Sequence, residues 1–260
     1  MLRSSALLSF AFSGLSVAAQ LLSDSCQTAL GGIVTNQDTA NCLNPSALIP
    51  IALNGGNVSI VQPIDNWLTG LCPQASCSNS TLETASRNIV AGCHAEFLSF
   101  GLDSNDPLVT DRLVSIVQRY YPAFHSIVCL KNSDTFCITE TLRAVETSVV
   151  PVTINNIPVL NDLWQRGRIP ANVTCSDCEK ETFNIITRDY PRPPITTDLN
   201  AAFSEQCGAA FVDGSTPSGI SQSASTTGPG SNNSAAGVGS FSLLVVGPSV
   251  AMAGLAAFVL

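Results

Sequence analysis

The sequence lacks the local patterns on which most protein catalysis depends. It holds only two histidines, His94 and His125, and it contains neither H-E-x-x-H nor G-x-S-x-G. Without such a signature, neither histidine is assigned to a Ser-His-Asp triad. We therefore expect no catalytic residue, no metal and no cofactor, and the working hypothesis is a protein that is not an enzyme.

Of the residues in this chain, the paired acids come closest in type to those of a known active site. Asp103 with Asp106 and Glu179 with Glu181 resemble, in residue type, the two carboxyl groups of a glycoside hydrolase. Both pairs fall at expected helix starts, where acids are favoured by the helix dipole. Capping is therefore the favoured interpretation, and a glycan-active enzyme is the weakest alternative.

Aromatic and basic residues are also scarce. The chain has two tryptophans and three tyrosines, whereas a groove that stacks on sugars needs exposed Trp or Tyr; Trp67 and Trp164 are interpreted as core or interface anchors. Its 11 basic residues are outnumbered by 19 acids, giving a net charge of −8. This balance argues against nucleic acid and anionic lipid surfaces as partners.

No charged residue follows Asp213. The stretch Phe241–Leu260 has about the length of a membrane-spanning helix but lacks the basic flank typical of one. It follows small residues and a short neutral spacer, which is the pattern of a GPI-attachment signal. An uncleaved C-terminal anchor is the competing interpretation. We expect attachment at Asn232 or Asn233, with Ser231 and Ser234 as alternatives, and removal of residues 235–260.

The first 19 residues have the pattern of a signal peptide. Arg3 precedes an apolar run, Ala6–Val17, and small residues at 17–19 predict cleavage before Gln20. Together the two ends predict a route through the secretory pathway to the outer face of the plasma membrane. Retention by the GPI lipid or exchange onto cell-wall glucan are both left open.

Ten cysteines lie between these ends. The even number and the oxidising route predict five disulfides, whose connectivity the sequence leaves open. The motif Cys175-Ser-Asp-Cys178 permits a redox alternative, but acids on either side of Cys178 oppose a thiolate, so a structural role is favoured. The cysteines are Cys26, Cys42, Cys72, Cys77, Cys93, Cys129, Cys137, Cys175, Cys178 and Cys207.

The chain between the ends divides at residue 212. Residues 20–212 predict a single, mainly α, disulfide-stapled domain, and 213–234 predict a disordered, O-glycosylated stalk rich in Ser, Thr, Gly and Pro. Three Asn-x-Ser/Thr sequons, at Asn57, Asn79 and Asn172, predict N-glycosylated surface positions.

The expected helices follow from caps and periodicity. Asp106 and Pro107 open one helix, which Pro122 should end or kink. A capping box at 80–83 opens a second helix, residues 174–177 a third and Thr197-Asp198 the last. Residues 149–160 predict a short strand or an extended segment. The first helix carries an apolar stripe of Val109, Leu113, Ile116, Val117 and Tyr120.

Several landmarks recur in a fixed order. They are Asn105-Asp106-Pro107-Leu108-Val109, Cys129-Leu130-Lys131 with Phe136-Cys137, Thr174 to Cys178, and Cys207-Gly208 with Phe211-Val212. In this order, and in its early cysteines, the chain resembles an uncharacterised family of fungal secreted proteins, often GPI-anchored, over nearly all of residues 24–212. The resemblance implies a ten-cysteine helical surface domain and no catalytic residues. The chain departs from the family around 150–170, at Trp164-Gln-Arg-Gly-Arg168.

These patterns favour a GPI-anchored cell-surface or cell-wall glycoprotein with a structural or interaction role. The alternative is a helical binding module that encloses a lipid, sterol or other apolar ligand between its helices. In the preferred hypothesis the apolar stripe packs in the core; in the alternative it lines the cavity.

Overall fold

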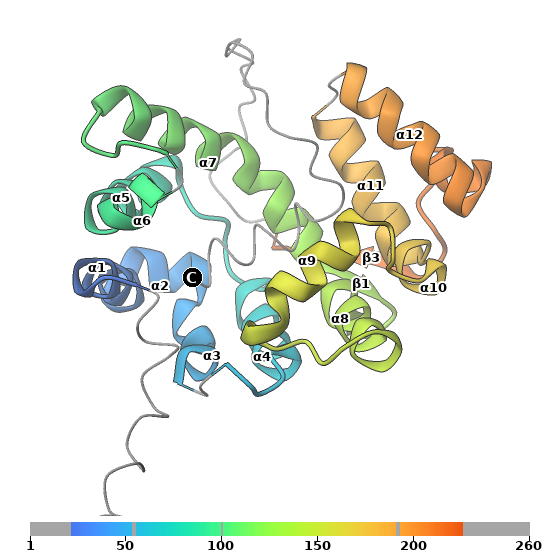
Figure 1. Ribbon diagram of the computed structural model, residues 1–260, viewed down its shortest axis with the longest axis horizontal. Coiled ribbons are helices and arrows are strands. Elements are labelled where there is room, and N and C mark those ends of the chain that lie inside the picture. The colour runs from blue at the N-terminus through green and yellow to red at the C-terminus, as the bar shows by residue number, and fades with distance from the viewer. Residues whose placement is uncertain (1–21, 54–55, 100, 191–192, 226–260) are drawn as a thin grey trace, which may run out of the picture.

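Helices make up most of the described chain and five disulfides join them, as the sequence predicts. The structure is a computed structural model that describes residues 22–53, 56–99, 101–190 and 193–225. In Figure 1 the longest helix, α7, runs from the N-terminal helices α1, α2, α5 and α6 toward α11, while α4, α8 and α9 lie below it. Helix α12 packs beside α11 at the far side.

The elements of the N-terminal half, up to the end of α7, are short helices apart from α5 and α7. Their bounds are α1 Asp24–Thr35, α2 Gln37–Leu43, η1 Pro45–Leu48, α3 Ile49–Leu53, α4 Val61–Leu71, α5 Asn79–Gly92, α6 His94–Ser99 and α7 Pro107–Val128.

The C-terminal half combines helices with three short strands. Its elements are β1 Leu130–Asn132, β2 Thr135–Phe136, α8 Cys137–Ser148, η2 Ile154–Asn156, α9 Ile157–Gln165, α10 Ala171–Thr174, α11 Asp177–Asp189, α12 Pro193–Cys207, η3 Ala209–Val212 and β3 Ile220–Gln222.

Side-chain caps explain where several helices begin. The Asp106 carboxylate accepts a hydrogen bond of 2.9 Å from the Leu108 N–H, and Pro107 fills the first position of α7, both as predicted. Ser176 caps α11 through the N–H of Glu179. Pro122 does not end α7: the helix continues to Val128, so the lost hydrogen bond is outweighed by packing on both sides of the proline.

Three other expectations need correction. Ser78, not Ser80, caps α5, because its hydroxyl accepts from the Thr81 N–H at 3.1 Å. Helix α12 begins at Pro193 instead of Thr197, since proline fits the first helical turn. Residues 149–160 form no strand; they pass through η2 into α9, whose first turn contains Pro158.

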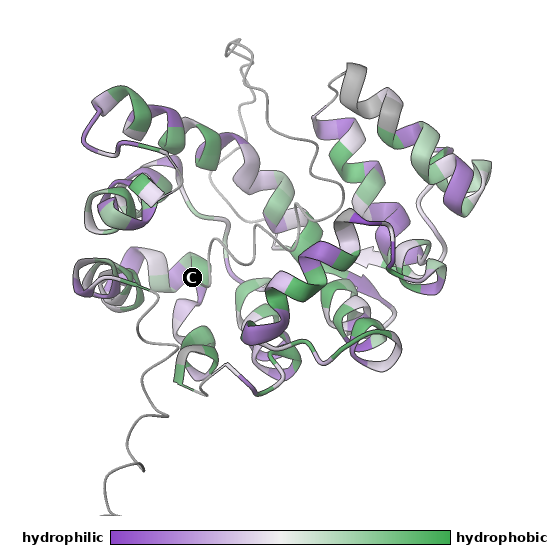
Figure 2. Cartoon of the chain, in the orientation of Figure 1, coloured by the Kyte–Doolittle hydropathy of each residue, from purple (hydrophilic) through white to green (hydrophobic). Residues whose placement is uncertain are grey.

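The main core lies between α4, α8 and the segments that pack on them. Ile64, Trp67 and Leu68 of α4 meet Leu142 and Val145 of α8. Figure 2 shows the apolar residues of α4 and α8 concentrated where these helices lie together. A second apolar cluster, Phe183, Phe203 and Phe211, joins α11 to α12 and η3.

The expected domain boundary at residue 212 is wrong. Strand β3 lies in the expected stalk, yet it pairs antiparallel with β1, placing Lys131 opposite Ser221 in a sheet of order β2-β1-β3. Small polar residues cannot build a core, but they can pair with the free edge of an existing strand. Residues 213–225, which we call the C-terminal strap, therefore belong to the folded domain.

Both predicted membrane-directed segments lie outside the described residues, as do residues 226–234 of the predicted stalk and all four candidate attachment residues, Ser231 to Ser234. Among the helices that the structure describes, none combines the length and the apolar character needed to span a bilayer.

Candidate functional site

All ten cysteines are paired, as the sequence predicts. The first three bridges tie the N-terminal helices to each other and to the end of α7, and the last two tie α8, α10, α11 and α12. No cysteine is free. The pairs are Cys26–Cys93, Cys42–Cys77, Cys72–Cys129, Cys137–Cys178 and Cys175–Cys207.

The redox alternative for the C-x-x-C motif is excluded by this pairing. Cys175 bonds to Cys207 and Cys178 bonds to Cys137, so the two cysteines of the motif do not bond to each other. Cys178 lies on the first turn of α11, facing α8, whereas Cys175 precedes the helix and faces α12. The motif therefore joins α11 to two different neighbours.

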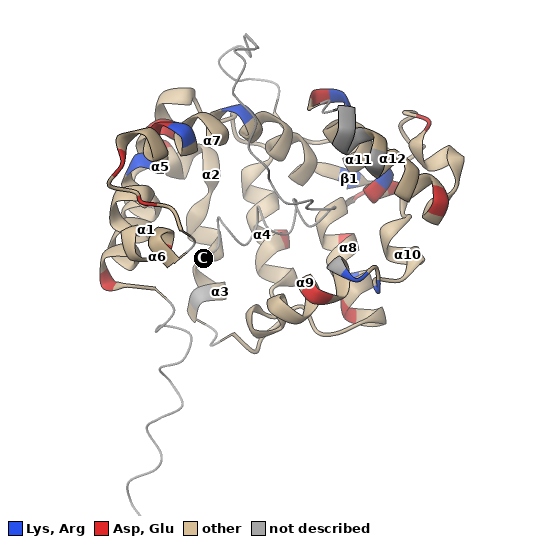
Figure 3. Ribbon diagram, turned by 45° about the horizontal axis from the view of Figure 1, so that its top comes forward, with Lys and Arg blue, Asp and Glu red and all other residues tan. Residues whose placement is uncertain are grey.

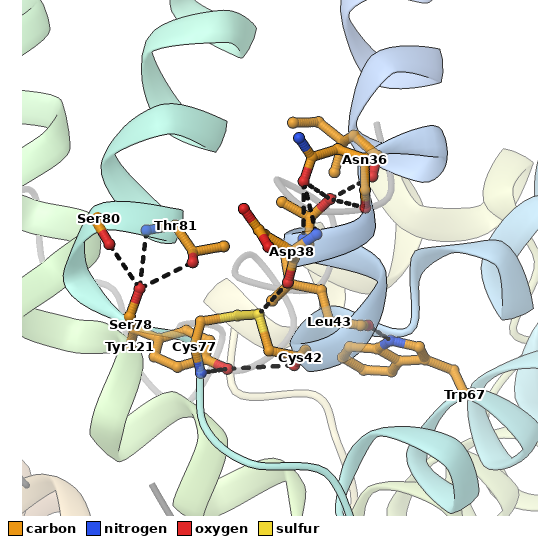
Figure 4. Close-up of a disulfide and its surroundings, with 12 residues drawn as sticks. Asn36, Asp38, Cys42, Leu43, Trp67, Cys77, Ser78, Ser80, Thr81 and Tyr121 are labelled. Carbon is orange, nitrogen blue, oxygen red and sulfur yellow. Dashed lines mark hydrogen bonds between the residues drawn. A yellow bond between two sulfur atoms is a disulfide. The ribbon is translucent and has the colours of Figure 1, made fainter. Parts of the chain in front are cut away.

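The Cys42–Cys77 bridge is set in a network of buried hydrogen bonds, shown in Figure 4. The Cys77 N–H donates to the Tyr121 hydroxyl at 3.2 Å, and that hydroxyl donates to the Cys42 carbonyl at 3.5 Å. Close by, the Trp67 indole N–H donates to the Leu43 carbonyl at 2.7 Å. These two side chains, Tyr121 and Trp67, satisfy backbone groups at which regular structure ends.

His125 lies one turn after Tyr121 on α7 and is buried. The two rings lie 5.7 Å apart between centroids. Burial lowers the pKa of His125, because no described acid offsets the cost of a charged imidazole. Among the described residues its Nε2 has no hydrogen-bond partner. A neutral, enclosed ring of this kind serves packing and is out of reach of a substrate.

His94 is held by the loop before α7. Its Nδ1 lies 2.7 Å from the Ser104 hydroxyl, and its Nε2 lies 3.0 Å from Asn105 Nδ2. Because the Asn105 amide donates to Nε2, a neutral His94 carries its proton on Nδ1 and donates it to Ser104. In that state the imidazole cannot take a proton from the serine, so the arrangement fastens the loop to α6.

The candidate acid pairs do not face each other. Asp103 and Asp106 accept hydrogen bonds from nearby backbone N–H groups, as capping predicts. Glu179 and Glu181 are two positions apart on α11, so their side chains leave opposite sides of the helix. This geometry is unlike the facing carboxyl groups of a glycosidase.

Among the described carboxylic acids whose pKa departs from its ordinary value, only Glu179 has a raised pKa. Burial raises the pKa of Glu179 from 4.5 to about 7, opposed by a hydrogen bond of 3.0 Å from the Thr141 hydroxyl of α8. The capping interpretation is wrong for this residue, because its carboxyl turns toward α8. Sequence patterns did not distinguish it from its neighbours, since its environment depends on Thr141, 38 residues earlier in the chain.

The C-terminal strap is fastened at both ends. At its start, Lys180 Nζ lies 2.8 Å from Asp213 and 2.9 Å from the Ser215 hydroxyl. At its end, the Ser223 N–H donates to the Cys129 carbonyl at 3.0 Å and the Ser225 N–H donates to the Cys72 carbonyl at 2.8 Å. The two residues whose carbonyls accept these hydrogen bonds, Cys72 and Cys129, form a disulfide with each other. The chain therefore leaves the described domain at a covalently braced point.

Lys180 controls the charge at the start of the strap. Its ammonium, with the Ser215 hydroxyl, holds the pKa of Asp213 well below its ordinary value. The Lys180 side chain is only 13% exposed, whereas that of Asp213 is 44% exposed. The sequence offered the opposite charges but no indication that they meet.

The three N-glycosylation sequons all lie on the surface. Asn57, Asn79 and Asn172 are exposed. Asn79 occupies the first position of α5 and Asn172 lies in α10, so both sit on helices. Exposure is the property that glycosylation requires, and the sites remain predictions.

The predicted apolar stripe on α7 does not coincide with the side of the helix that is buried. Ile116 is 41% exposed and the other four members are only half-buried, whereas Val114, Tyr121 and Val128 are buried. The difference corresponds to one residue, or about 100° around the helix. The stripe is therefore not the closed core face that the preferred hypothesis expects.

Within the described ranges, the charged residues do not gather into a candidate site. In Figure 3 the basic residues are dispersed over several elements. Cys26, Cys93 and Glu96 come close enough to suggest metal ligands, but the two sulfurs form a disulfide and Glu96 accepts from the Ser23 N–H at 2.5 Å. Those groups are already used, and a disulfide offers no thiolate.

Comparison with protein-family models, curated proteins and solved structures found no match for this chain.

Proposed function

We propose that this chain is a GPI-anchored glycoprotein of the cell surface or cell wall, with a structural or interaction role. The observation that carries the proposal is the pairing of all ten cysteines in five disulfides. Such bridges form and persist in oxidising compartments. The signal-peptide pattern at 1–19 and the attachment pattern at 231–234 give the same compartment independently.

The position of the strap indicates how close to the membrane the anchor would hold the domain. The described chain ends at Ser225, beside the Cys72–Cys129 disulfide. Attachment at Asn232 would leave residues 226–232 between that point and the lipid, a reach of at most about 25 Å. The anchor would therefore hold the domain close to the membrane, with its braced exit point on the near side.

Lipid release is the direct test. In cells that express the full chain, we expect phosphatidylinositol-specific phospholipase C to release the protein from the surface. Replacing residues 231–234 with glutamine should abolish surface attachment, because transfer needs small residues there. The matched control places glutamine at Thr226 and Thr227. If the phospholipase does not release the protein and the replacement of residues 231–234 does not reduce surface attachment, the protein instead has an uncleaved anchor.

Wall glucan is the alternative point of attachment. If the lipid is exchanged after transport, protein that the phospholipase leaves behind should be released from isolated walls by a glucanase. Release by the phospholipase alone would place the protein on the membrane and remove glucan as a covalent partner.

A further inference from the structure

Exposed large apolar side chains are concentrated around one loop. Seven are found among the described residues, and four of them come from α3, from the loop that follows it, and from α9. Figure 2 colours much of α3 and parts of α9 as apolar. We call these four side chains the Asn57 face: Ile49 (41% exposed), Leu53 (77%), Val58 (51%) and Val159 (48%).

Backbone and side-chain hydrogen bonds bring these segments together. The Asn155 N–H donates to the Gly56 carbonyl at 3.1 Å, and the Ile60 N–H donates to the Val152 carbonyl at 3.0 Å. Asn155 belongs to η2, which leads directly into α9. Gly56 has φ +79°, and a Cβ there would lie 2.6 Å from Asn155 Oδ1. The positive φ favours glycine, and a Cβ here would displace the Asn155 amide that bonds Asn57, so the loop is held against η2 through this glycine.

Asn57 directly precedes Val58 of this face, and its amide is oriented. Its Oδ1 accepts a hydrogen bond of 2.8 Å from Asn155 Nδ2. Among the described residues no hydrogen bond occupies Asn57 Nδ2, and the residue is exposed. Because the oxygen is held by Asn155, the nitrogen that would carry a sugar has a set direction.

We propose that an N-linked glycan on Asn57 is a structural part of this domain and covers the Asn57 face. This inference rests on the secretory route of the proposed function. Transfer forms a bond between Asn57 Nδ2 and C1 of the first N-acetylglucosamine. It breaks the bond from C1 to the pyrophosphate of a lipid-linked donor, and the amide proton is lost to solvent.

The sugar suits the face chemically. One side of a pyranose ring is made of C–H groups and packs on aliphatic side chains, while its hydroxyls remain in water. Covering Val58 and its neighbours removes apolar surface that otherwise favours self-association. The hydrogen bond to Asn155 reduces the number of directions that the first sugar can take, so covering the face loses less conformational entropy.

Asn79 and Asn172 provide internal controls. Both are exposed sequons, but Asn79 is flanked by Ser78 and Ser80, and neither has an exposed large apolar residue beside it in the sequence. Sugars there should change solubility without covering an apolar face.

The test compares three single variants secreted from a eukaryotic host as residues 20–231: Asn57→Asp, Asn79→Asp and Asn172→Asp. Aspartate keeps an oxygen for Asn155 at position 57 while removing the sugar. We expect Asn57→Asp to bind the apolar dye bis-ANS several-fold more strongly than the parent protein and to self-associate on a sizing column. The two control variants should match the parent protein.

A second measurement separates covering from folding. Peptide N-glycosidase applied to the folded parent protein removes the sugar and converts Asn57 to aspartate, so dye binding should rise as it does in the variant. An endoglycosidase that leaves one N-acetylglucosamine should preserve the low dye binding, because the first sugar makes the contact. Equal dye binding before and after the N-glycosidase would overturn the proposal.

The pattern of glycan occupancy at the three sequons distinguishes a failure of this inference from a failure of the proposed function. Sugars at Asn79 or Asn172 with none at Asn57, found by intact mass and peptide mapping, would overturn the inference and leave the surface-glycoprotein proposal standing. A chain that is not secreted and carries no sugar at any of the three sites would overturn both.

Discussion

The Ser225 N–H donates a hydrogen bond of 2.8 Å to the carbonyl of Cys72, so the end of the strap is fixed beside the Cys72–Cys129 disulfide. A segment with the composition of a flexible linker is thus part of the folded domain. The stability of the domain should depend on it.

Truncation tests the strap. Ending the protein at residue 212 leaves the carbonyls of Cys72 and Cys129 without these partners and leaves Lys180 without Asp213. We expect the free energy of unfolding to fall by about 2–4 kcal/mol relative to residues 20–225, at about 1 kcal/mol for each lost hydrogen bond. Equilibrium urea unfolding of the two proteins measures it. Identical midpoints would mean that the strap contributes nothing.

Disulfide mapping tests the pairing around the C-x-x-C motif. Digestion without reduction should give linked peptides for Cys137–Cys178 and Cys175–Cys207, and none for Cys175–Cys178. Replacing Cys175 and Cys207 together with alanine should cost about 2–4 kcal/mol, because the unfolded chain regains the freedom of a 32-residue loop. A mapped Cys175–Cys178 bridge would contradict the fold at α11.

Glu179 should give the domain an unusual pH dependence. Its folded pKa of about 7 lies above the unfolded value of 4.5, so the folded state favours the protonated acid. This contribution is fully present below about pH 4.5 and is lost as the pH rises through 7. Glu179→Gln should therefore stabilise the protein at pH 8 by up to about 3 kcal/mol and change little at pH 4. Urea unfolding at both pH values measures the difference.

Thr141→Val is the companion variant for Glu179. The threonine hydroxyl favours the ionised carboxylate, so its removal should move the Glu179 midpoint to higher pH. A carbon-13 titration of the Glu179 carboxyl follows this directly. An ordinary midpoint near 4.5 in the parent protein would show that the carboxyl is not buried.

Tyr121→Phe tests the network at Cys42–Cys77. The phenyl ring keeps the packing, but the buried N–H of Cys77 loses its acceptor. We expect a loss of about 1–3 kcal/mol. Tyr190→Phe is the control, because its hydroxyl bonds the Arg119 carbonyl at an exposed position where water can replace it. Equal costs for the two variants would argue against a buried network.

Local sequence signals were enough to predict much of the fold. The cap at Asp106 and the helix start within residues 174–177 depend on neighbouring residues, and the structure has both, with Ser176 as the cap of α11. The α5 and α12 starts were missed because several residues nearby could cap equally well. The strap was missed because β-pairing depends on a free strand edge, which composition does not record.

The sequence alone determined the helical class, the pairing of every cysteine with some partner, and the surface position of the three sequons. These depend on local chemistry: caps, residue counts and the polarity of a side chain. Only the tertiary structure decided which cysteines bond, that the Glu179 carboxyl turns toward α8, and where the strap docks. Each of these needs two segments far apart in the chain to meet, and their distance is set by packing of the whole domain.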